Sequence, residues 1–313
     1  MIKIDLITGF LGAGKTTFIR NYAKYLINQG MNIGILENDF GAVNVDAMLL
    51  QDILGDNCTL EMVAGGCDAD CHSRRFKTKL IAMGMCGYDR ILVEPSGIFD
   101  MDEFFDVLHE EPLERWYEIG SVITIIDAGL TQDLSDASHY LLASEAAHAG
   151  TLLYSHTTDV TKEQIAATEA YVKQSLELLH CKKLKEPLTI KKDFDALKES
   201  DYNAILSSGY HAADYAKFRF NDKTYDSLYF MNMDFSEEFL RQSCEKILQD
   251  PSCGKVFRIK GFQKLPDSHW ISVNATHEKI EIQPVLDGQA ILIVIGEKLN
   301  KETLEQYWGK SKA

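Results

Sequence analysis

Basic residues are scarce in this sequence. Its 313 residues include 32 lysines and arginines against 47 aspartates and glutamates, so the formal net charge is −15. A negative surface repels phosphate backbones and anionic lipid headgroups, which argues against nucleic acid or a membrane surface as partner. Long apolar runs are missing too. The longest, residues 290–295, has the length of a strand and not the ~20 residues that span a bilayer.

Cysteine is infrequent and odd in number, with seven residues spread along the chain. The apolar residues 1–10 run straight into a glycine loop without the cleavage signature of a secretory signal. We therefore expect a cytoplasmic protein with free thiols instead of disulfides. Most of the thiols are expected to be buried small hydrophobic groups. These are Cys58, Cys86, Cys181, Cys244 and Cys253.

The first two-thirds of the chain alternate short apolar runs with helical patterns. Strands are expected at 2–8, 31–37, 59–63, 90–94, 122–126 and 151–155, and helices at 16–28, 73–82, 136–148 and 161–179. This alternation is typical of βαβ units, so it predicts a doubly wound, mostly parallel α/β domain over residues 1–215. A stretch from about 191 to 223 is expected to be the joint between domains.

After the joint the pattern changes to consecutive strands with few helices. Strands are expected at 227–233, 255–261, 269–274, 279–284 and 290–295, and helices at 236–248 and 301–307. Such an order predicts a smaller α+β domain with an antiparallel sheet over residues 216–313.

A glycine-rich segment follows the first strand and opens the first helix. It fits the P-loop pattern, in which backbone N–H groups and the helix N-terminus surround phosphates. Lys15 is expected to reach the β/γ-phosphates, and Thr16 to bind Mg²⁺. The candidate nucleotide-binding residues here are Gly9, Gly12, Ala13, Gly14, Lys15, Thr16 and Thr17.

Four acidic residues lie at or just after strand ends, on the edge where Gly9 lies: Glu37, Glu94, Asp127 and Asp159. Open α/β sheets bind ligands at that edge. Glu94 follows the apolar run of residues 91–93 and resembles a Walker B acid that holds Mg²⁺. Lys15, Thr16 and Glu94 are thus the candidate catalytic residues, with Thr16 and Glu94 as Mg²⁺ ligands.

Residues 67–72 combine two thiols, two carboxylates and an imidazole. Thiolate and imidazole suit Zn²⁺ or a similar ion, and a carboxylate can complete the coordination. Cys67 and Cys71 are the leading ligands, with Glu37, Asp70 and His72 as further candidates. Free thiols at a loop–helix junction are the alternative.

Several motifs occur together in one order: the P-loop, residues 37–41 with Asp46, Gly66-Cys67, and residues 94–97. The chain thereby resembles the CobW-type P-loop GTPases, which are metallochaperones and metalloenzyme activators related to hydrogenase and urease maturation GTPases. Residues 258–262 and 293–296 resemble that family's C-terminal domain. The resemblance implies that residues 37–46 belong to switch I, with Asp39 near Mg²⁺.

Two motifs depart from the family pattern. The family has Gly-Cys-x-Cys-Cys, whereas here Ala69 and Asp70 replace the later cysteines and Cys71 comes one residue late. The family reads guanine with Asn-Lys-x-Asp, whereas residues 156–159 are His-Thr-Thr-Asp. Asp159 is expected to accept hydrogen bonds from guanine, or else only to precede a helix cap at Thr161.

The resemblance implies a GTP-binding protein that hydrolyses GTP slowly, at about 10⁻⁴ to 10⁻² s⁻¹, because no arginine finger is identifiable. Mg²⁺·GTP would control the binding or delivery of a transition metal to a client metalloprotein or metalloenzyme, recognised by the C-terminal domain. Two alternatives stay open, a nucleotide-switched binding module without enzymatic activity and a P-loop small-molecule kinase. A homo-oligomer is also left open.

Overall fold

The computed structural model divides the chain into two compact units, residues 1–218 and 219–313. The described residues are 1–10, 12–39, 46–64, 69–95, 101–130, 134–178, 186–211, 226–265, 267–277, 279–285, 288 and 290–309. The boundary that we predicted, between residues 215 and 216, falls outside these ranges. Each unit is described by itself.

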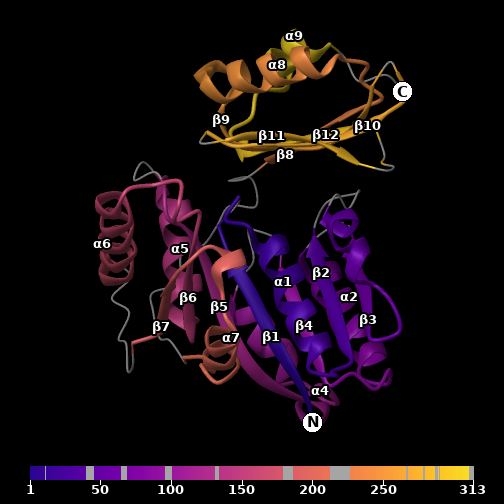
Figure 1. Ribbon diagram of the computed structural model, residues 1–313, viewed down its shortest axis with the longest axis vertical. Coiled ribbons are helices and arrows are strands. Elements are labelled where there is room, and N and C mark those ends of the chain that lie inside the picture. Colours follow the sequence, from indigo (N-terminus) through magenta and orange to yellow (C-terminus); the bar gives the residue numbers. More distant parts are fainter. Residues whose placement is uncertain are drawn as a thin grey trace. The chain divides into compact units, whose positions relative to one another are not determined.

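Seven parallel strands form the sheet of the first unit, in the order β3-β2-β4-β1-β5-β6-β7 (Figure 1). The central strands carry almost continuous apolar runs, and every residue of β4 is buried. Such runs are expected where helices cover both faces of a parallel sheet. The strands are β1 Ile2–Gly9, β2 Ile33–Asp39, β3 Cys58–Ala64, β4 Arg90–Pro95, β5 Tyr117–Asp127, β6 Thr151–Ser155 and β7 Leu188–Lys191.

Helices cover both faces of this sheet. Phe18 of α1 and Ile205 of α7 belong to the core on one face, and Phe76 of α2 and Phe104 of α3 to the core on the other. A third cluster joins α5 and α6 to β5 and β6. The elements are α1 Lys15–Asn28, η1 Asp46–Ile53, α2 Ala69–Met83, α3 Met101–Leu108, α4 Leu113–Trp116, α5 Asp136–His148, α6 Lys162–Leu178, η2 Phe194–Ala196 and α7 Glu199–Leu206.

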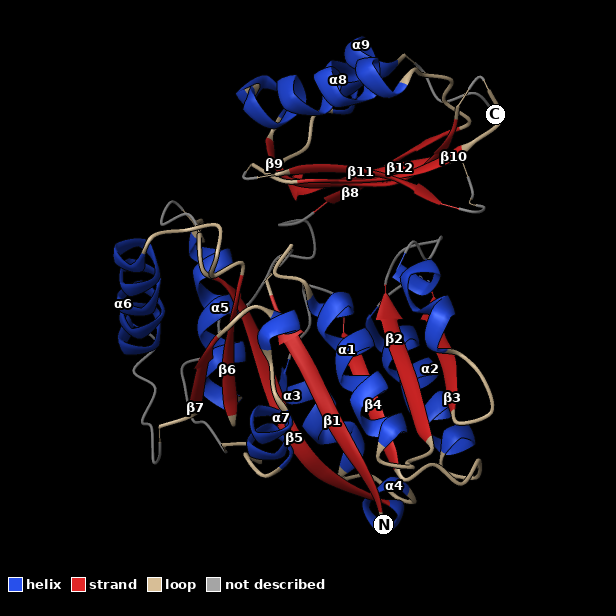
Figure 2. Cartoon of the chain, viewed as in Figure 1, coloured by secondary structure: helices blue, strands red, loops and turns tan. Residues whose placement is uncertain are grey.

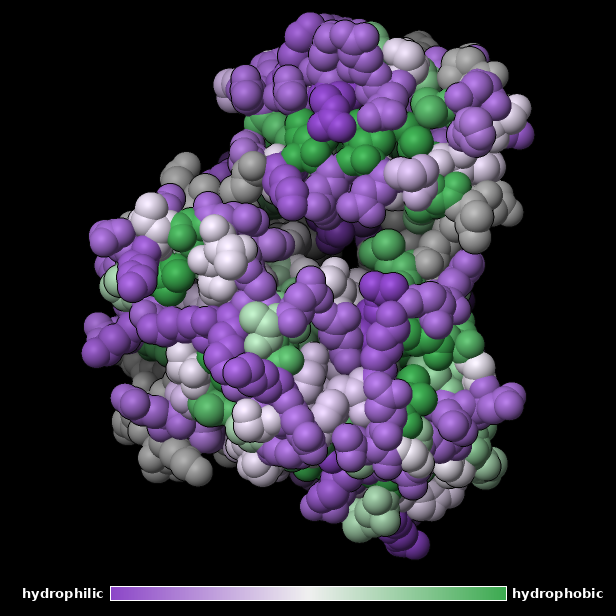
Figure 3. Space-filling view, in the orientation of Figure 1, coloured by the Kyte–Doolittle hydropathy of each residue, from purple (hydrophilic) through white to green (hydrophobic). Residues whose placement is uncertain are grey.

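The second unit is an antiparallel sheet in the order β11-β10-β9-β12-β8, with α8 and α9 on one face (Figure 2). Leu240 and Ile247 of α8 and Trp308 of α9 pack into its core. Figure 3 shows hydrophilic residues over most of the visible surface, with hydrophobic residues between these helices and the sheet. The elements are β8 Asp226–Met231, α8 Glu237–Gln249, η3 Pro251–Cys253, β9 Lys255–Lys264, β10 Trp270–Ala275, β11 Ile280–Val285, β12 Ile291–Glu297 and α9 Lys301–Trp308.

The predicted fold class is confirmed, a doubly wound parallel α/β sheet followed by a smaller α+β unit. The predicted joint at 191–223 is partly wrong, because α7 lies inside it. Tyr202 and Ile205 of this short helix are buried in the first unit, although their flanking residues are polar. Among the described residues, no helix is long and apolar enough to cross a membrane.

The expectation that the five cysteines outside the 67–72 motif are buried holds for three of them. Cys58, Cys244 and Cys253 are buried free thiols, whereas Cys86 is exposed. Cys86 follows the end of α2, in a turn that the apolar pattern of the helix does not reach. Cys181 lies outside the described residues.

A buried ion pair joins the first strands of the sheet. The Asp5 carboxylate is fully buried and accepts hydrogen bonds from Arg90 Nη1 at 2.5 and 2.7 Å, Tyr22 Oη at 2.9 Å and the Ser121 amide at 2.8 Å. Four donated hydrogen bonds offset the cost of removing this charge from water. The network ties β1 to β4, β5 and α1.

Replacing Asp5 should destabilise the first unit strongly. Asp5→Ala leaves the Arg90 guanidinium buried without its carboxylate, which costs about 3–5 kcal/mol of unfolding free energy. Urea unfolding followed by circular dichroism measures this loss. The control is Glu118→Ala, which removes the half-exposed partner of Lys3 and should leave the midpoint nearly unchanged. Equal midpoints for the two variants would show that the Asp5 network contributes little.

Candidate nucleotide site

The glycine loop has a backbone that requires glycine. Gly9 has φ +140°, and a Cβ there would lie 2.2 Å from the Ile125 carbonyl oxygen of β5. Gly12 and Gly14 also have positive φ, +88° and +90°. Gly14 is the N-cap of α1, so the helix begins directly at the loop. The loop and the first turn of α1 form the type of backbone that binds phosphate groups.

Lys15 is held against this loop. Its side chain is buried, and Nζ donates to the Gly9 carbonyl at 2.8 Å and to the Phe10 carbonyl at 3.4 Å. The two carbonyl oxygens keep the ammonium group beside the backbone that would surround a phosphate. A flexible, compact point charge in this position suits the β/γ-phosphates that we predicted as its ligands.

Thr16 and Glu94 meet at the same edge of the sheet. Thr16 Oγ1 donates to the Glu94 carboxylate, at 3.1 Å from Oε1 and 3.0 Å from Oε2. Glu37 of β2 is opposite Glu94 of β4 in register, and both are buried. The Thr16 hydroxyl and the Glu94 carboxylate are hard oxygen donors that suit Mg²⁺, and Glu37 places a second carboxylate on the neighbouring strand.

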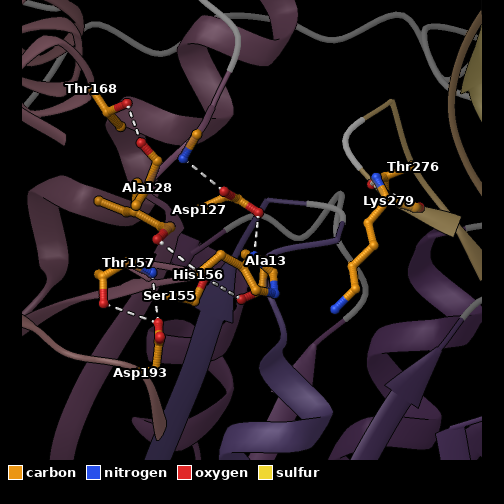
Figure 4. Close-up of polar contacts among 12 residues, drawn as sticks. Ala13, Asp127, Ala128, Ser155, His156, Thr157, Thr168, Asp193, Thr276 and Lys279 are labelled. Carbon is orange, nitrogen blue, oxygen red and sulfur yellow. Dashed lines mark hydrogen bonds and ion pairs between the residues drawn. The ribbon is translucent and has the colours of Figure 1, made fainter. Parts of the chain in front are cut away.

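A second set of contacts joins the loop to the end of β6 (Figure 4). Ser155 Oγ donates to the Ala13 carbonyl at 2.8 Å, which connects β6 with the glycine loop. His156 follows with φ +52°, and its Nδ1 donates to Asp127 Oδ2 at 2.6 Å. The left-handed turn therefore aims the imidazole at the carboxylate ending β5.

The next two threonines are held by a single carboxylate. Asp193 accepts from the Thr157 amide at 2.6 Å and hydroxyl at 3.0 Å, and from the Thr158 hydroxyl at 2.5 Å and amide at 3.2 Å. Burial favours the neutral acid, but the hydrogen bonds outweigh it and lower the pKa of Asp193. The ionised carboxylate thus fixes the 156–158 turn to the end of β7.

Asp159 is exposed, and its amide donates to the His156 carbonyl at 3.2 Å. The predicted capping box follows it. The Thr161 amide donates to Gln164 Oε1 at 2.8 Å, and the Gln164 amide donates to Thr161 Oγ1 at 3.3 Å. Thr161 therefore starts α6 as predicted, and the Asp159 side chain is left at the surface.

Much of the predicted metal motif lies outside the described residues. Cys67 does, and of Asp70, Cys71 and His72 only the backbone is described, in the first turn of α2. Asp39 ends β2, and its side chain is likewise not described. Among the described side chains, no cluster of three or more histidine, cysteine, aspartate or glutamate residues could hold a metal ion.

Sequence reasoning missed Ser155 and Glu145, which lie near the loop, and Asp193, which holds the 156–158 turn. Ser155 had a usable signal, because it ends the strand next to β5 at the ligand edge. Asp193 lies in the stretch that we predicted to be a joint. Glu145 is buried on α5 near Lys15, in a helix whose pattern does not mark it.

The family model described as the CobW/HypB/UreG nucleotide-binding domain matches residues 3–181, more than half of the chain. The model described as the cobalamin synthesis protein cobW C-terminal domain matches residues 231–311. The first match lies within the first unit and the second within the second unit.

Two curated relatives are zinc chaperones of Escherichia coli (strain K12). YeiR is 28% identical over 176 residues, 56% of this chain and 52% of YeiR. YjiA is 34% identical over 140 residues, 41% of each chain. The chain thus spans about half or less of the relatives it matches. The crystal structure of the Zn(II)-bound YjiA GTPase from E. coli aligns over 98% of this chain and 97% of that chain, with 19% identity and a TM-score of 0.39.

Lys15→Ala should weaken nucleotide binding without unfolding the protein. The change removes a charge-assisted contact to phosphate, worth roughly 1.5 to 3 kcal/mol or about 10- to 150-fold in affinity for Mg²⁺·GTP. Calorimetric titration measures the affinity. Lys173→Ala, which removes an exposed lysine on α6, is the matched control and should bind like the wild type. A folded Lys15→Ala protein with unchanged affinity would contradict the assignment of the loop.

Asp159→Asn tests base recognition. A carboxylate accepts from both guanine N1–H and the 2-amino group, so losing it should cost about 10- to 150-fold in GTP affinity. The wild type should prefer GTP to ITP and to ATP, and the variant should gain affinity for XTP. Binding of the four nucleotides to both proteins is measured by competition. If ATP binds the wild type as tightly as GTP and the substitution changes neither affinity, Asp159 does not read the base.

Proposed function

The chain belongs to the CobW/HypB/UreG family of nucleotide-binding proteins, and from that premise we propose that it is a GTP-binding, slowly GTP-hydrolysing metallochaperone or metalloenzyme activator. The observation that carries the proposal is that three buried side chains, Lys15, Thr16 and Glu94, lie together at the glycine loop. The two relatives named as zinc chaperones support a transition metal, with Zn²⁺ the first candidate, as cargo.

The chain's own residues would act by position and charge. The loop amides and the N-terminus of α1 bind the phosphates, and Lys15 places a positive charge on the β/γ-phosphates. Thr16 Oγ1 donates to the Glu94 carboxylate, which keeps these two proposed Mg²⁺ ligands together. Mg²⁺ held by Thr16 and Glu94, with Asp39 as a further proposed ligand, would neutralise developing negative charge. Without an identified arginine finger, we expect slow turnover in isolation.

The position of β3 supports a link between nucleotide and cargo metal. The last residue of β3, Ala64, is opposite Asp39 of β2 in register, at the edge that holds Glu37 and Glu94. Cys67 is three residues further on, and three residues reach at most about 10 Å. β3 therefore ends beside the proposed Mg²⁺ donors, and α2 begins five residues after Ala64, at Ala69. We propose Cys67 and Cys71 as the main ligands of the cargo ion, with Glu37, Asp70 or His72 completing its coordination.

The second unit is the proposed site of client recognition. It matches the C-terminal domain model of the same family and has its own hydrophobic core. A domain with its own core can present a binding surface independently of the nucleotide site. The client would be a metalloprotein or metalloenzyme.

The two other functions weighed from the sequence are less supported. A small-molecule kinase is disfavoured because the family model and the named relatives point to metallochaperones and GTPases. A nucleotide-switched module without turnover would use the same loop. Steady-state GTP hydrolysis, with and without client, distinguishes that module from the proposed GTPase.

Nucleotide and cargo metal should bind cooperatively. If Mg²⁺·GTP strengthens Zn²⁺ binding, Zn²⁺ must strengthen GTP binding by the same factor, because the coupling free energy is reciprocal. Zn²⁺ is titrated with and without a non-hydrolysable GTP analogue, and the analogue with and without Zn²⁺. Zn²⁺ affinity should also fall as the pH is lowered, since protons compete for the thiolates.

The double variant Cys67→Ser/Cys71→Ser should lose Zn²⁺ binding and keep GTP binding. Cys86→Ser is the matched control, because it removes an exposed thiol outside the motif and should bind Zn²⁺ like the wild type. Zn²⁺ affinities that are equal with and without the analogue, or that survive the double substitution, would contradict the proposal.

A further inference from the structure

Glu145 is a buried carboxyl group that the proposed mechanism does not use. It lies on α5, which packs against β1 and β5, and only 1% of its surface is exposed. Among the described residues, its Oε2 atom has no hydrogen-bond partner. A buried carboxyl oxygen without a partner is costly, and a protein rarely keeps one without a role.

The Gly9 backbone adjoins both Glu145 and Lys15. The Gly9 amide lies beside the Glu145 carboxyl and stabilises its charged form, while the Gly9 carbonyl accepts a hydrogen bond from Lys15 Nζ at 2.8 Å. The backbone of α5 is held next to the end of β1. Thr124 Oγ1 donates to the Glu145 carbonyl at 2.9 Å and also contacts Thr8 Oγ1, one residue before Gly9, at 2.9 Å. The Glu145 side chain therefore packs beside the first residue of the glycine loop.

We propose that Glu145 is a positioning residue for the phosphate-binding loop. Its carboxyl group holds the Gly9 amide and, when ionised, competes with the nucleotide phosphates for the Lys15 ammonium. The inference rests on the proposed nucleotide binding and deepens it. Protonation of Glu145 frees the charge of Lys15 for the phosphates. Nucleotide binding should accordingly be accompanied by uptake of a proton at this carboxyl group.

The electrostatics of the site agree with that geometry. Burial raises the pKa of Glu145 to about 7, against the opposing effects of the Lys15 charge and the Gly9 hydrogen bond. Bound Mg²⁺·GTP adds negative charge and draws Lys15 toward the phosphates, and both changes raise this pKa further. The free protein loses the proton above pH 7 while the complex keeps it, so nucleotide affinity must fall as the pH rises through that range.

Among the described side chains, the other charged groups on the elements around α5 have partners elsewhere or are exposed. Asp5 of β1 is paired with Arg90, Asp127 of β5 with His156, and Glu169 of α6 with Lys191. Asp106 of α3 is exposed. On α5 itself, His139 contacts Ser175 and His148 contacts the His211 carbonyl. Lys15 is the charged side chain that acts on Glu145.

The test is the pH dependence of nucleotide affinity in the full chain. Affinity for Mg²⁺ and a non-hydrolysable GTP analogue is measured from pH 6 to 8 for the wild type, Glu145→Gln and Glu169→Gln. The amide of Glu145→Gln keeps an acceptor for Gly9 and carries no charge. Wild-type affinity should fall by up to about tenfold over this range, and Glu169→Gln should follow it. Glu145→Gln should keep the affinity that the wild type has at pH 6.

Calorimetry in buffers of different ionisation enthalpy gives a second readout, the number of protons taken up on binding. The wild type should take up protons on binding near pH 7, and Glu145→Gln should take up fewer. Wild-type binding without proton uptake, or a Glu145→Gln variant with the wild-type pH profile, would overturn the role of Glu145 and leave the proposed function intact. Absence of nucleotide binding at every pH would instead refute the proposed function itself.

Discussion

The candidate site depends on how closely the end of β1 approaches β5. At Gly9 a Cβ would lie 2.2 Å from the Ile125 carbonyl oxygen, so no side chain can be accommodated. This approach lets the Gly9 carbonyl face Lys15 and its amide face Glu145. Since α1 begins at Lys15, the loop also sets the direction in which Thr16 meets Glu94. A larger residue at position 9 would disturb all of these contacts together.

The parts of the fold and the site that could be predicted are those with a local signal. The glycine loop lies between an apolar strand and a helix in the sequence itself, and Glu94 directly follows an apolar run. The glycine loop and Glu94 lie close together because parallel strands place their carboxyl ends at one edge of the sheet. The register that brings Glu37 opposite Glu94 is consistent with the same rule.

The parts that could not be predicted depend on contacts between distant segments. Nothing near Glu145 in the sequence indicates that it reaches the Gly9 amide, because that contact depends on how α5 packs against β1. Asp193 lies in a polar stretch that resembles a linker, and its role appears only when β7 is paired beside β6. The short helix α7 was missed for a related reason: its burial comes from tertiary packing and not from a long apolar pattern.

The burial of three thiols has a consequence for metal selectivity. Burial raises the pKa of Cys58 and Cys253 to about 11 and that of Cys244 to about 12, so these sulfur atoms stay protonated and enclosed at neutral pH. On the proposed function, a metal ion would find no accessible thiolate at these three positions, so they would not compete with the proposed cargo ligands. Cys86 is the exposed one among the described free cysteines, which makes it a convenient position for a reporter dye.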